Sequence, residues 1–469
     1  MIYKLPAALL LYFIGFSIWT AAAQVRPVSG VPVPGLTALD SAMQGIMQAN
    51  DIGAGVLALM KDETVVYRRA FGWQDKQRDT PLRPDCLMRI ASVTKPFTAA
   101  AIRHLISSGV IAPDSQVFSG RDPGSGILDY EAFGTRDMRL TDITVDHLLK
   151  HQGGWDRDAP GIPDHTYQEK QIANEMGIAS PPTRVNIVRW IMGKALQFDP
   201  GTNTAYSNIG FLLLGLIVEE ASGETLLDYL HENVLAPMGV TPGRILFGRS
   251  FQADQDDREP YYDAGGSTSA NVFFPSSSND LLVERPYGSW NHEARVGQGA
   301  IVADPLAILA YLSAHQVAGN NIGGPRPAPG NWKWNHTGSL WGTSCLARQR
   351  GDGINYTVIF NKRPLSGSSY ALQMRTALDG IIESGTIDSW PTQDVRFQQV
   401  PIPEITINAN PVAIRLPSSA GRYYRLMQSA NLRDWNPAAS PLIGDGAELS
   451  FILSANSDGL MYYRVEIIQ

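Results

Sequence analysis

The chain has 469 residues and a mass of 51.2 kDa, which is too large for one ordinary hydrophobic core, so two or three structural units are expected. Hydrophobic residues make up 44% of the sequence and charged residues 18%, a composition that excludes wholesale disorder. The net charge is -7 and only nine of the 38 basic residues are lysine, which argues against a nucleic-acid partner. Two cysteines allow one disulfide at most and exclude a disulfide scaffold.

Residues 1–23 have the layout of a cleavable export signal. Lys4 precedes an apolar run over residues 9–19, and three alanines end the segment at Ala23. The apolar run is shorter than the roughly 20 residues that a membrane anchor requires, and no later segment reaches that length. We therefore expect cleavage near Ala23 and a secreted or periplasmic protein with no membrane span after cleavage.

The first part of the chain predicts a helix, a β-hairpin and a second helix. Residues 36–50 place apolar side chains at helical spacing. Residues 53–60 and 64–71 are strand-like runs on either side of a short polar turn, which predicts an antiparallel hairpin. A helix is expected over residues 93–108, with Ser92 as the capping residue at its start.

The middle of the chain is mixed. Residues 187–196 and 211–229 are expected to be helical, whereas residues 251–296 form a long polar and aromatic insertion. The insertion contains four acidic residues close together, which are Asp254, Asp256, Asp257 and Glu259. These acids lack the spacing of a calcium-binding loop, so a solvated surface is expected there.

The last part of the chain predicts a second hairpin, a helix and a separate small unit. The hairpin is expected over residues 340–348 and 356–361, around a Gly-Asp-Gly turn, and the helix over residues 369–384. Four prolines in the following stretch predict a linker over residues 388–411. Short β-type runs beyond it predict a small all-β module over residues 412–469.

Ser92 and Lys95 are the first candidates for catalysis. If a helix begins at Ser92, the spacing of three residues puts the Lys95 ammonium beside the Ser92 hydroxyl at a helix N-terminus, and this arrangement can activate a nucleophile. Such a short pattern also occurs often by chance, so it needs support from other segments.

A second segment contains Tyr206 and Asn208 in a Tyr-Ser-Asn phrase. A phenol can act as a general base when neighbouring cations lower its pKa. Asn208 has the amide needed to orient Lys95 and a substrate amide. Taken alone, this phrase is equally typical of a half-buried tyrosine at the start of a helix.

A third segment is His336-Thr337-Gly338, followed by Ser339, in a Gly-rich turn that leads into an expected edge strand. Glycine lets a substrate backbone approach closely, and the N–H groups of such a strand can hold a developing oxyanion together with the N–H of Ser92. A single histidine is more often structural, and its place in this turn makes a functional role about equally favoured.

In order, spacing and context, these segments resemble the penicillin-recognising serine hydrolases related to class C β-lactamases and D,D-peptidases. The resemblance covers residues 36–385 and rests on four phrases, which are Arg89-Ile90-Ala91-Ser92-Val93-Thr94-Lys95, Tyr206-Ser207-Asn208, Gly297-Gln298-Gly299-Ala300 and His336-Thr337-Gly338-Ser339-Leu340. It implies an α/β (α+β) fold of the β-lactamase/transpeptidase type over residues 36–387, in which helices flank an antiparallel sheet and a helical subdomain is inserted.

The resemblance also implies a role for each matching residue. Ser92 would attack a carbonyl carbon and become acylated, while Lys95 and Tyr206 would share the general-base work, and which of the two accepts the proton stays open. The N–H groups of Ser92 and Ser339 would form the oxyanion hole. Substrate binding would fall to five residues, which are Asn208, His336, Thr337, Gly338 and Ser339.

His336 departs from the commoner Lys-Thr-Gly of the family. Relatives with histidine here include D-amino-acid peptidases, and histidine holds a carboxylate less firmly at neutral pH than lysine does. We therefore expect an exported serine hydrolase acting on an ester, a D-amino-acid peptide or a β-lactam, that is, on a small-molecule or peptidoglycan-type substrate. The alternatives are a penicillin-binding sensor with the same fold and little turnover, and a degenerate scaffold for the C-terminal module; the oligomeric state stays open.

Other chemistries find little support in the sequence. There is no Gly-x-Ser-x-Gly elbow, phosphate loop or dinucleotide fingerprint, and neither a cofactor nor a metal is implied. His147 and His151 lack a zinc-binding pattern and are expected at a helix end and the turn after it. Cys86 and Cys345 flank the predicted site, and two buried free thiols are favoured over a disulfide between them.

Overall fold

The computed structural model describes most of the chain. The described ranges are 26–120, 122–159, 164–274, 281–396, 406–409, 412–418, 423–429, 436–444, 448–452 and 462–468. The export signal expected over residues 1–23 lies outside them and stays a prediction. None of the helices in these ranges combines the length and the apolar character that a membrane crossing needs.

A six-stranded antiparallel sheet forms the centre of the fold. Its strands, in spatial order, are β1 (Val28–Ser29), β3 (Thr64–Gly72), β2 (Ala54–Lys61), β11 (Ile354–Phe360), β10 (Thr343–Arg350) and β9 (Lys333–Leu340). The two predicted hairpins are therefore β2–β3 and β10–β11, and they join through the pairing of β2 with β11. β9 lies at the edge of this sheet, so one side of its backbone is not paired within it.

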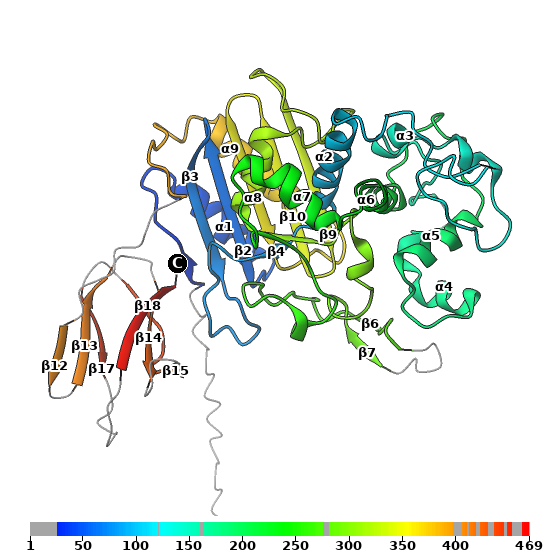
Figure 1. Cartoon of the computed structure of the whole chain (residues 1–469). Helices are drawn as coiled ribbons and strands as arrows, with labels where there is room; N and C mark the ends of the chain where they lie inside the picture. Colours follow the sequence, from blue (N-terminus) through cyan, green and yellow to red (C-terminus); the bar gives the residue numbers. More distant parts are fainter. Residues whose placement is uncertain are drawn as a thin grey trace, which may run out of the picture.

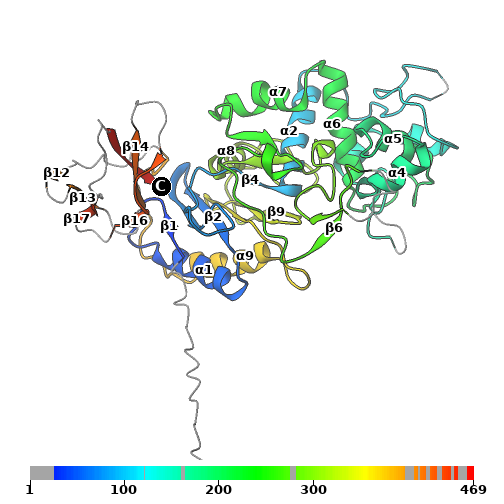
Figure 2. The same ribbon diagram turned by 90° about the horizontal axis from the view of Figure 1, so that it is seen from below.

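Helices cover both faces of the sheet. α1 (Thr37–Ala49) and α9 (Tyr370–Glu383) pack on one face, and α2 (Thr94–Ser107) and α8 (Pro305–Ala314) lie on the other (Figures 1 and 2). Alternate residues of β2 enter two different cores, with Leu57 on the side of α1 and α9 and Val56 on the side of α2 and α8. This alternation follows from the two-residue period of a strand and explains why β2 is apolar along nearly its whole length.

An inserted helical region lies beside α2. It consists of α3 (Val145–Leu149), α4 (Glu169–Met176), α5 (Arg184–Met192), α6 (Asn208–Ser222) and α7 (Leu226–Leu230). Every residue of α6 from Asn208 to Val218 is buried, because α2, α3, α5 and α7 pack around this helix. The side chain of Ser207 caps α6 by accepting from Gly210 N at 3.2 Å, which fixes where Asn208 enters the core.

The insertion over residues 251–296 is more ordered than its composition suggests. It contains β6 (Thr268–Ala270) and β7 (Leu282–Glu284), which pair with each other; nearby, β4 (Met88–Arg89), β8 (Ile301–Ala303) and β5 (Ile245–Phe247) form a separate small sheet. The prediction of a solvated acidic group was wrong for Glu259, which is only 7% exposed. Its Oε2 accepts a hydrogen bond from the Tyr262 hydroxyl at 2.7 Å, and burial raises the pKa of Glu259.

The C-terminal part contains small all-β sheets with a core of their own, which includes Leu416, Tyr424 and Phe451. One sheet holds β12 (Thr406–Ala409), β13 (Val412–Pro417) and β17 (Glu448–Ile452), and the other holds β14 (Tyr423–Ser429), β15 (Asn436–Pro437), β16 (Leu442–Ile443) and β18 (Tyr462–Ile468). The predicted fold class is thereby confirmed. β12 falls inside the segment predicted as a linker, and the domain boundaries themselves stay a prediction.

Candidate active site

Ser92 lies in a tight turn between β4 and α2. The 3-10 helix η1 (Ala91–Val93) precedes α2, and Ala91 adopts a positive φ of 48°, a conformation that non-glycine residues rarely adopt. The sequence expectation that Ser92 caps α2 was wrong, since Val93 is the residue before α2 and no side chain caps this end. The extra turn leaves the half-buried Ser92 hydroxyl without a capping bond, and it accepts a hydrogen bond from Lys95 instead.

The segment that leads to Ser92 is held by residues distant in sequence. Arg89 N donates to the Tyr262 hydroxyl at 2.9 Å, and the Thr343 hydroxyl donates to Arg89 O at 2.6 Å. Ile90 N donates to Ile301 O at 3.0 Å. Because three separate parts of the chain fix this segment, the position of the following serine is fixed as well.

Lys95 is completely buried and its ammonium makes three hydrogen bonds. It donates to Ser92 Oγ at 3.2 Å, to Asn208 Oδ1 at 2.8 Å and to the Gln298 carbonyl at 2.7 Å. These bonds match the three donors of an ammonium. Burial lowers the pKa of Lys95, and the phenol of Tyr206 opposes that shift. The amine is thus easier to deprotonate than an exposed lysine.

Tyr206 and Asn208 lie beside Lys95, as the sequence predicted. The Lys95 ammonium is 4.9 Å from the centre of the Tyr206 ring. Asn208 is the first residue of α6, and its Nδ2 donates to Asp164 Oδ2 at 2.5 Å. The hydroxyl of Ser92 and the ring of Tyr206 therefore both lie within 5 Å of one nitrogen atom.

The third segment lies on the edge strand beside η1. His336 and Gly338 are inside β9 rather than in a turn before it, which corrects the sequence expectation. A Cβ atom on Gly338 would lie 2.0 Å from the Ile90 carbonyl oxygen, so only glycine lets β9 approach the turn that carries Ser92. Desolvation, with Lys95 as the second cause, lowers the pKa of His336 to about 4, so its ring is neutral at pH 7.

Three residues that the sequence did not assign to the site also meet there. The His151 ring packs against the Tyr206 ring with centroids 4.7 Å apart, and the Arg157 guanidinium lies 4.3 Å from the centre of the same ring. Burial lowers the pKa of His151 to about 3, and its Nδ1 accepts from Ser207 N at 3.1 Å. Asp164 is the third, through its bond to Asn208. No motif marks these residues, because their partners are 44 or more positions away.

The other sequence candidates have structural places. His147 caps α3 together with Thr144, and no group of three His, Cys, Asp or Glu side chains in the described ranges is arranged to hold a metal. Cys86 and Cys345 are buried free thiols, and burial raises the pKa of both. No disulfide therefore ties β10 to the segment before Ser92.

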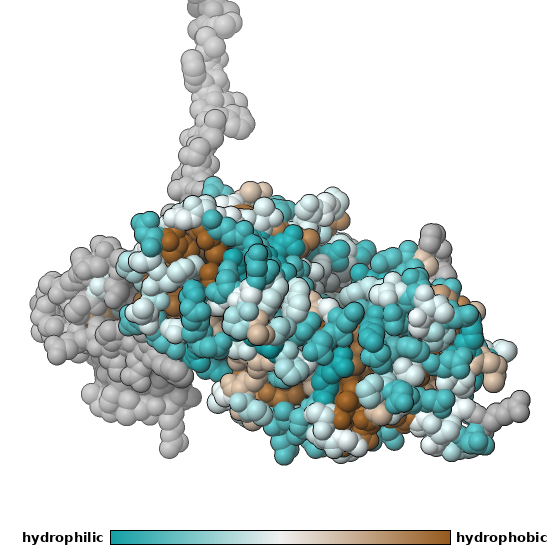
Figure 3. All heavy atoms as spheres, turned by 90° about the horizontal axis from the view of Figure 1, so that it is seen from above, coloured by the Kyte–Doolittle hydropathy of each residue, from teal (hydrophilic) through white to brown (hydrophobic). Residues whose placement is uncertain are grey.

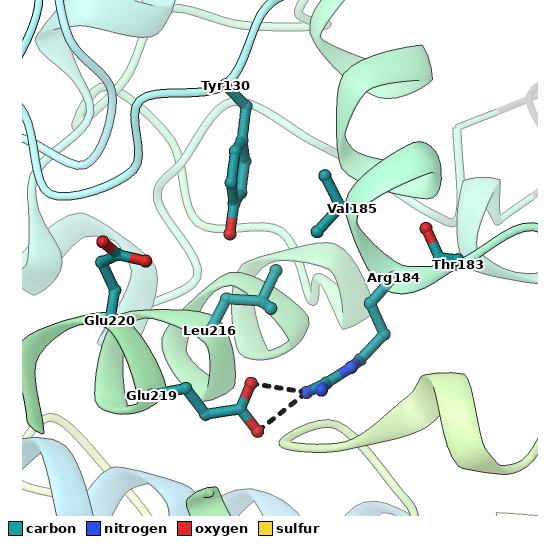
Figure 4. A pocket seen from close by; sticks show the side chains of 7 residues that line it. All are labelled: Tyr130, Thr183, Arg184, Val185, Leu216, Glu219 and Glu220. Carbon is teal, nitrogen blue, oxygen red and sulfur yellow. Dashed lines mark hydrogen bonds and ion pairs between the residues drawn. The ribbon is translucent and has the colours of Figure 1, made fainter. Parts of the chain in front are cut away.

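A pocket of about 310 Å³ lies in the helical region, away from these residues (Figure 4). In it, Arg184 donates to both carboxylate oxygens of Glu219 at 2.9 Å, and Tyr130 points toward this pair from the opposite wall. None of the predicted site residues lines this pocket. The chemistry expected from the sequence therefore belongs to the surroundings of Ser92.

Fold and site together define a class of protein with an antiparallel sheet between helices and a serine, just before α2, that accepts a hydrogen bond from a buried lysine in the first turn of that helix. The chain belongs to the Beta-lactamase family, whose model matches residues 39–377. This confirms the resemblance that the four sequence phrases indicated.

Three curated relatives illustrate the range of the family. The chain is 26% identical over 225 residues to a penicillin-binding protein of Bacillus subtilis (strain 168), covering 46% of this chain and 43% of that protein. It is 28% identical to Esterase EstB of Burkholderia gladioli, covering 43% of this chain and 49% of that protein. It is 25% identical to a D-aminopeptidase of Brucella anthropi, covering 45% of this chain and 36% of that protein. The matched part thus spans half or less of the length of these relatives.

Solved structures share the fold at low sequence identity. The D-amino acid amidase from Ochrobactrum anthropi SV3, complexed with D-phenylalanine, is 19% identical with a TM-score of 0.51, covering 75% of this chain and 99% of that one. An octameric penicillin-binding protein homologue from Pyrococcus abyssi is 19% identical with a TM-score of 0.52, covering 92% and 96%. At these identities the likeness concerns the fold alone.

Proposed function

We propose that this protein is an exported serine hydrolase that works through an acyl-enzyme on Ser92. The observation that supports this most directly is the hydrogen bond from the buried Lys95 ammonium to Ser92 Oγ at 3.2 Å. A lysine with a lowered pKa beside a serine hydroxyl is an arrangement that activates a nucleophile.

The reaction follows from the positions of the groups. Ser92 Oγ attacks the substrate carbonyl carbon, and its proton passes to the base shared by Lys95 and Tyr206. The N–H groups of Ser92 and Ser339 stabilise the negative oxygen that forms. The same base returns the proton to the leaving alcohol or amine as its bond to the carbonyl breaks. Water then attacks the acyl carbonyl carbon and gives a proton to the same base, which passes it to Ser92 Oγ as the bond to the acyl group breaks and the acid leaves.

Esters and D-amino-acid peptides are the substrates we favour. Relatives named as an esterase and a D-aminopeptidase support both classes. A neutral His336 gives a β-lactam carboxylate less attraction than the lysine of the commoner motif, so efficient β-lactam hydrolysis is the weakest of the three proposals.

Turnover of a p-nitrophenyl ester tests the proposal. We expect steady release of p-nitrophenol, which should fall about a thousandfold or more in Ser92→Ala and be kept in Ser107→Ala, which changes the last residue of α2. A phosphonate inhibitor should label the peptide that carries Ser92. Labelling at a different residue would overturn the mechanism.

The same experiment separates the enzyme from the sensor. A burst of p-nitrophenol followed by a stalled acyl-enzyme would favour a penicillin-binding sensor with little turnover. A fluorescent penicillin used beside the phosphonate distinguishes the substrates, since labelling by the phosphonate alone points to an esterase.

Export has its own test. Expression with the native N-terminus in a bacterial host should give a mature protein in the periplasm or medium that begins at Gln24. A protein that keeps Met1 and stays in the cytoplasm would contradict the proposed export.

A further inference from the structure

Two arginines lie over one tryptophan at the end of β9. Trp341 and Gly342 form the two-residue turn between β9 and β10. The guanidinium carbon of Arg285, which follows β7, is 4.4 Å from the centre of the Trp341 ring, and that of Arg363, which follows β11, is 4.9 Å from it. All three side chains are half-buried, so solvent reaches them.

Neither arginine has an acidic partner in the described part of the chain. Within the ranges that the structure describes, no carboxylate oxygen lies within 4.0 Å of the guanidinium nitrogens of Arg285 or Arg363. Arg285 Nε donates to the Thr268 carbonyl at 3.3 Å, whereas Arg363 Nε is buried and has no hydrogen-bond partner among the described residues. Most other arginines of the chain, among them Arg68 and Arg350, have such partners.

The acids of the neighbourhood are already used by other cations. Glu284, next to Arg285 in sequence, accepts from Lys76 at 2.5 Å and from the Tyr261 hydroxyl at 2.8 Å. Asp263 pairs with Lys362 at 3.1 Å. Positive charge is therefore concentrated around Trp341 without compensation from these side chains.

This concentration of charge is costly unless an anion joins it. Burial lowers the pKa of Arg363, the phenol of Tyr167 opposes that shift, and Arg285 adds to it. A carboxylate would remove the repulsion and accept paired N–H bonds from the planar guanidinium groups. The exposed part of the Trp341 ring offers an apolar surface to the carbon chain that carries the carboxylate.

The arginines lie over a tryptophan that directly follows the C-terminal end of β9, beyond Ser339. Trp341 packs against a small cluster that contains Ala91, the residue before Ser92, and it follows Ser339 by two positions. His336 lies on β9 five residues before Trp341, which is about 16 Å at the usual rise of a strand. A group held at Trp341 is thus separate from any group held at His336.

We propose that Arg285, Trp341 and Arg363 form an anion subsite that binds a carboxylate on the part of the substrate lying beyond Ser339, away from His336. The inference rests on the proposed function, because it places the scissile carbonyl at Ser92. It narrows the substrate class to esters or amides that carry a free carboxylate on the acyl group or on the leaving group.

Paired substrates test the subsite. The first pair is p-nitrophenyl hydrogen glutarate against p-nitrophenyl valerate, with the charge on the acyl group. The second is 3-acetoxybenzoate against phenyl acetate, with the charge on the leaving group. We expect kcat/KM to favour the charged member of one pair by about tenfold or more, the factor that one charge-assisted hydrogen bond provides.

Variants show whether the preference for the charged substrate depends on Arg285 and Arg363. It should disappear in the double variant Arg285→Gln and Arg363→Gln, with turnover of the neutral ester kept, and it should weaken in 0.5 M NaCl. Arg326→Gln is the matched control, because Arg326 lies over Trp332 near the other end of β9 but is paired with Glu63. A preference that survives the double variant, or no preference in either pair, would overturn the proposal.

Binding separates this inference from the proposed function. If the wild-type protein hydrolyses no ester, the proposed function fails, and calorimetry with glutarate still tests the subsite. We expect glutarate to bind Ser92→Ala about tenfold more tightly than the same protein with both arginines replaced by glutamine. The variant with both arginines replaced by lysine, which keeps the charge, serves if the glutamine variant does not fold. Equal affinity of Ser92→Ala with its arginines and of the variant with both arginines replaced by glutamine would overturn the subsite.

Discussion

The side-chain oxygen of Asn208 accepts a hydrogen bond from the Lys95 ammonium at 2.8 Å, joining the first residue of α6 to the first turn of α2. Asp164 sets the orientation of this amide. A carboxylate only accepts hydrogen bonds, so the amide nitrogen must face Asp164 and the oxygen must face Lys95. The position of the candidate base thus depends on a carboxylate that has no place in the three sequence motifs.

Asp164→Ala should weaken both the site and the fold. It leaves a buried amide N–H unsatisfied, which costs about 1–3 kcal/mol, and lets Asn208 rotate away from Lys95. We expect kcat/KM for a p-nitrophenyl ester to fall about tenfold or more, with a lower urea midpoint. Asp129→Ala, which removes an exposed carboxylate, is the matched control. Wild-type kcat/KM in Asp164→Ala would show that Asn208 needs no such anchor.

Tyr206→Phe separates the phenol hydroxyl from the ring. The ring keeps its contacts with His151 and Arg157, so the free energy of unfolding should change by less than about 1 kcal/mol. Loss of the proton-transfer group should lower kcat by about a hundredfold or more. Tyr130→Phe, in the separate pocket of Figure 4, should leave kcat unchanged. An unchanged kcat in Tyr206→Phe would assign the base to Lys95 alone.

Gly338→Ala should displace β9 from the turn that carries Ser92. The added methyl group would meet the Ile90 carbonyl at 2.0 Å, and backbone must move to relieve that contact. We expect a loss of about 1–3 kcal/mol in the free energy of unfolding and of about a hundredfold in kcat/KM. Gly380→Ala, in α9 with open space around it, should instead stabilise by about 0.5–1 kcal/mol. Full activity in Gly338→Ala would refute the close approach of β9 to the turn that carries Ser92.

The stability of the protein should fall at acid pH in part through His336. The folded state holds the pKa of His336 at about 4, below the roughly 6.5 of an unfolded chain, so protons bind the unfolded state first. The contribution is fully present above pH 6.5 and is lost as the pH falls toward 4. In His336→Gln, the free energy of unfolding should drop about 1–3 kcal/mol less between pH 7 and pH 4. Urea titrations of both proteins at each pH check this. An equal drop in the free energy of unfolding in both proteins would contradict it.

In the view of Figure 3, hydrophobic residues form separate patches among hydrophilic ones, and no apolar face dominates that side of the molecule. Substitutions at the polar site residues therefore change local contacts rather than an extended apolar surface. Each variant is best compared with the wild type by melting temperature before its kinetics are interpreted.

Local patterns in the sequence determined the secondary structure and the candidate nucleophile. Helical spacing predicted α1, capping signals predicted α2, and strand-like runs around short turns predicted both hairpins. The spacing of three residues likewise placed Lys95 beside Ser92, since both lie on successive turns of one helical segment. The resemblance of four short phrases to known hydrolases then gave roles to the other candidates, Tyr206 and His336.

Only the tertiary structure decided what surrounds that nucleophile. His151, Arg157 and Asp164 reach Tyr206 and Asn208 across 44 or more positions of sequence, and no local period encodes such contacts. The same holds for the two arginines at Trp341, which come from separate segments of the chain. Long-range packing brings these neighbours together, whereas local sequence patterns predict the elements that carry them.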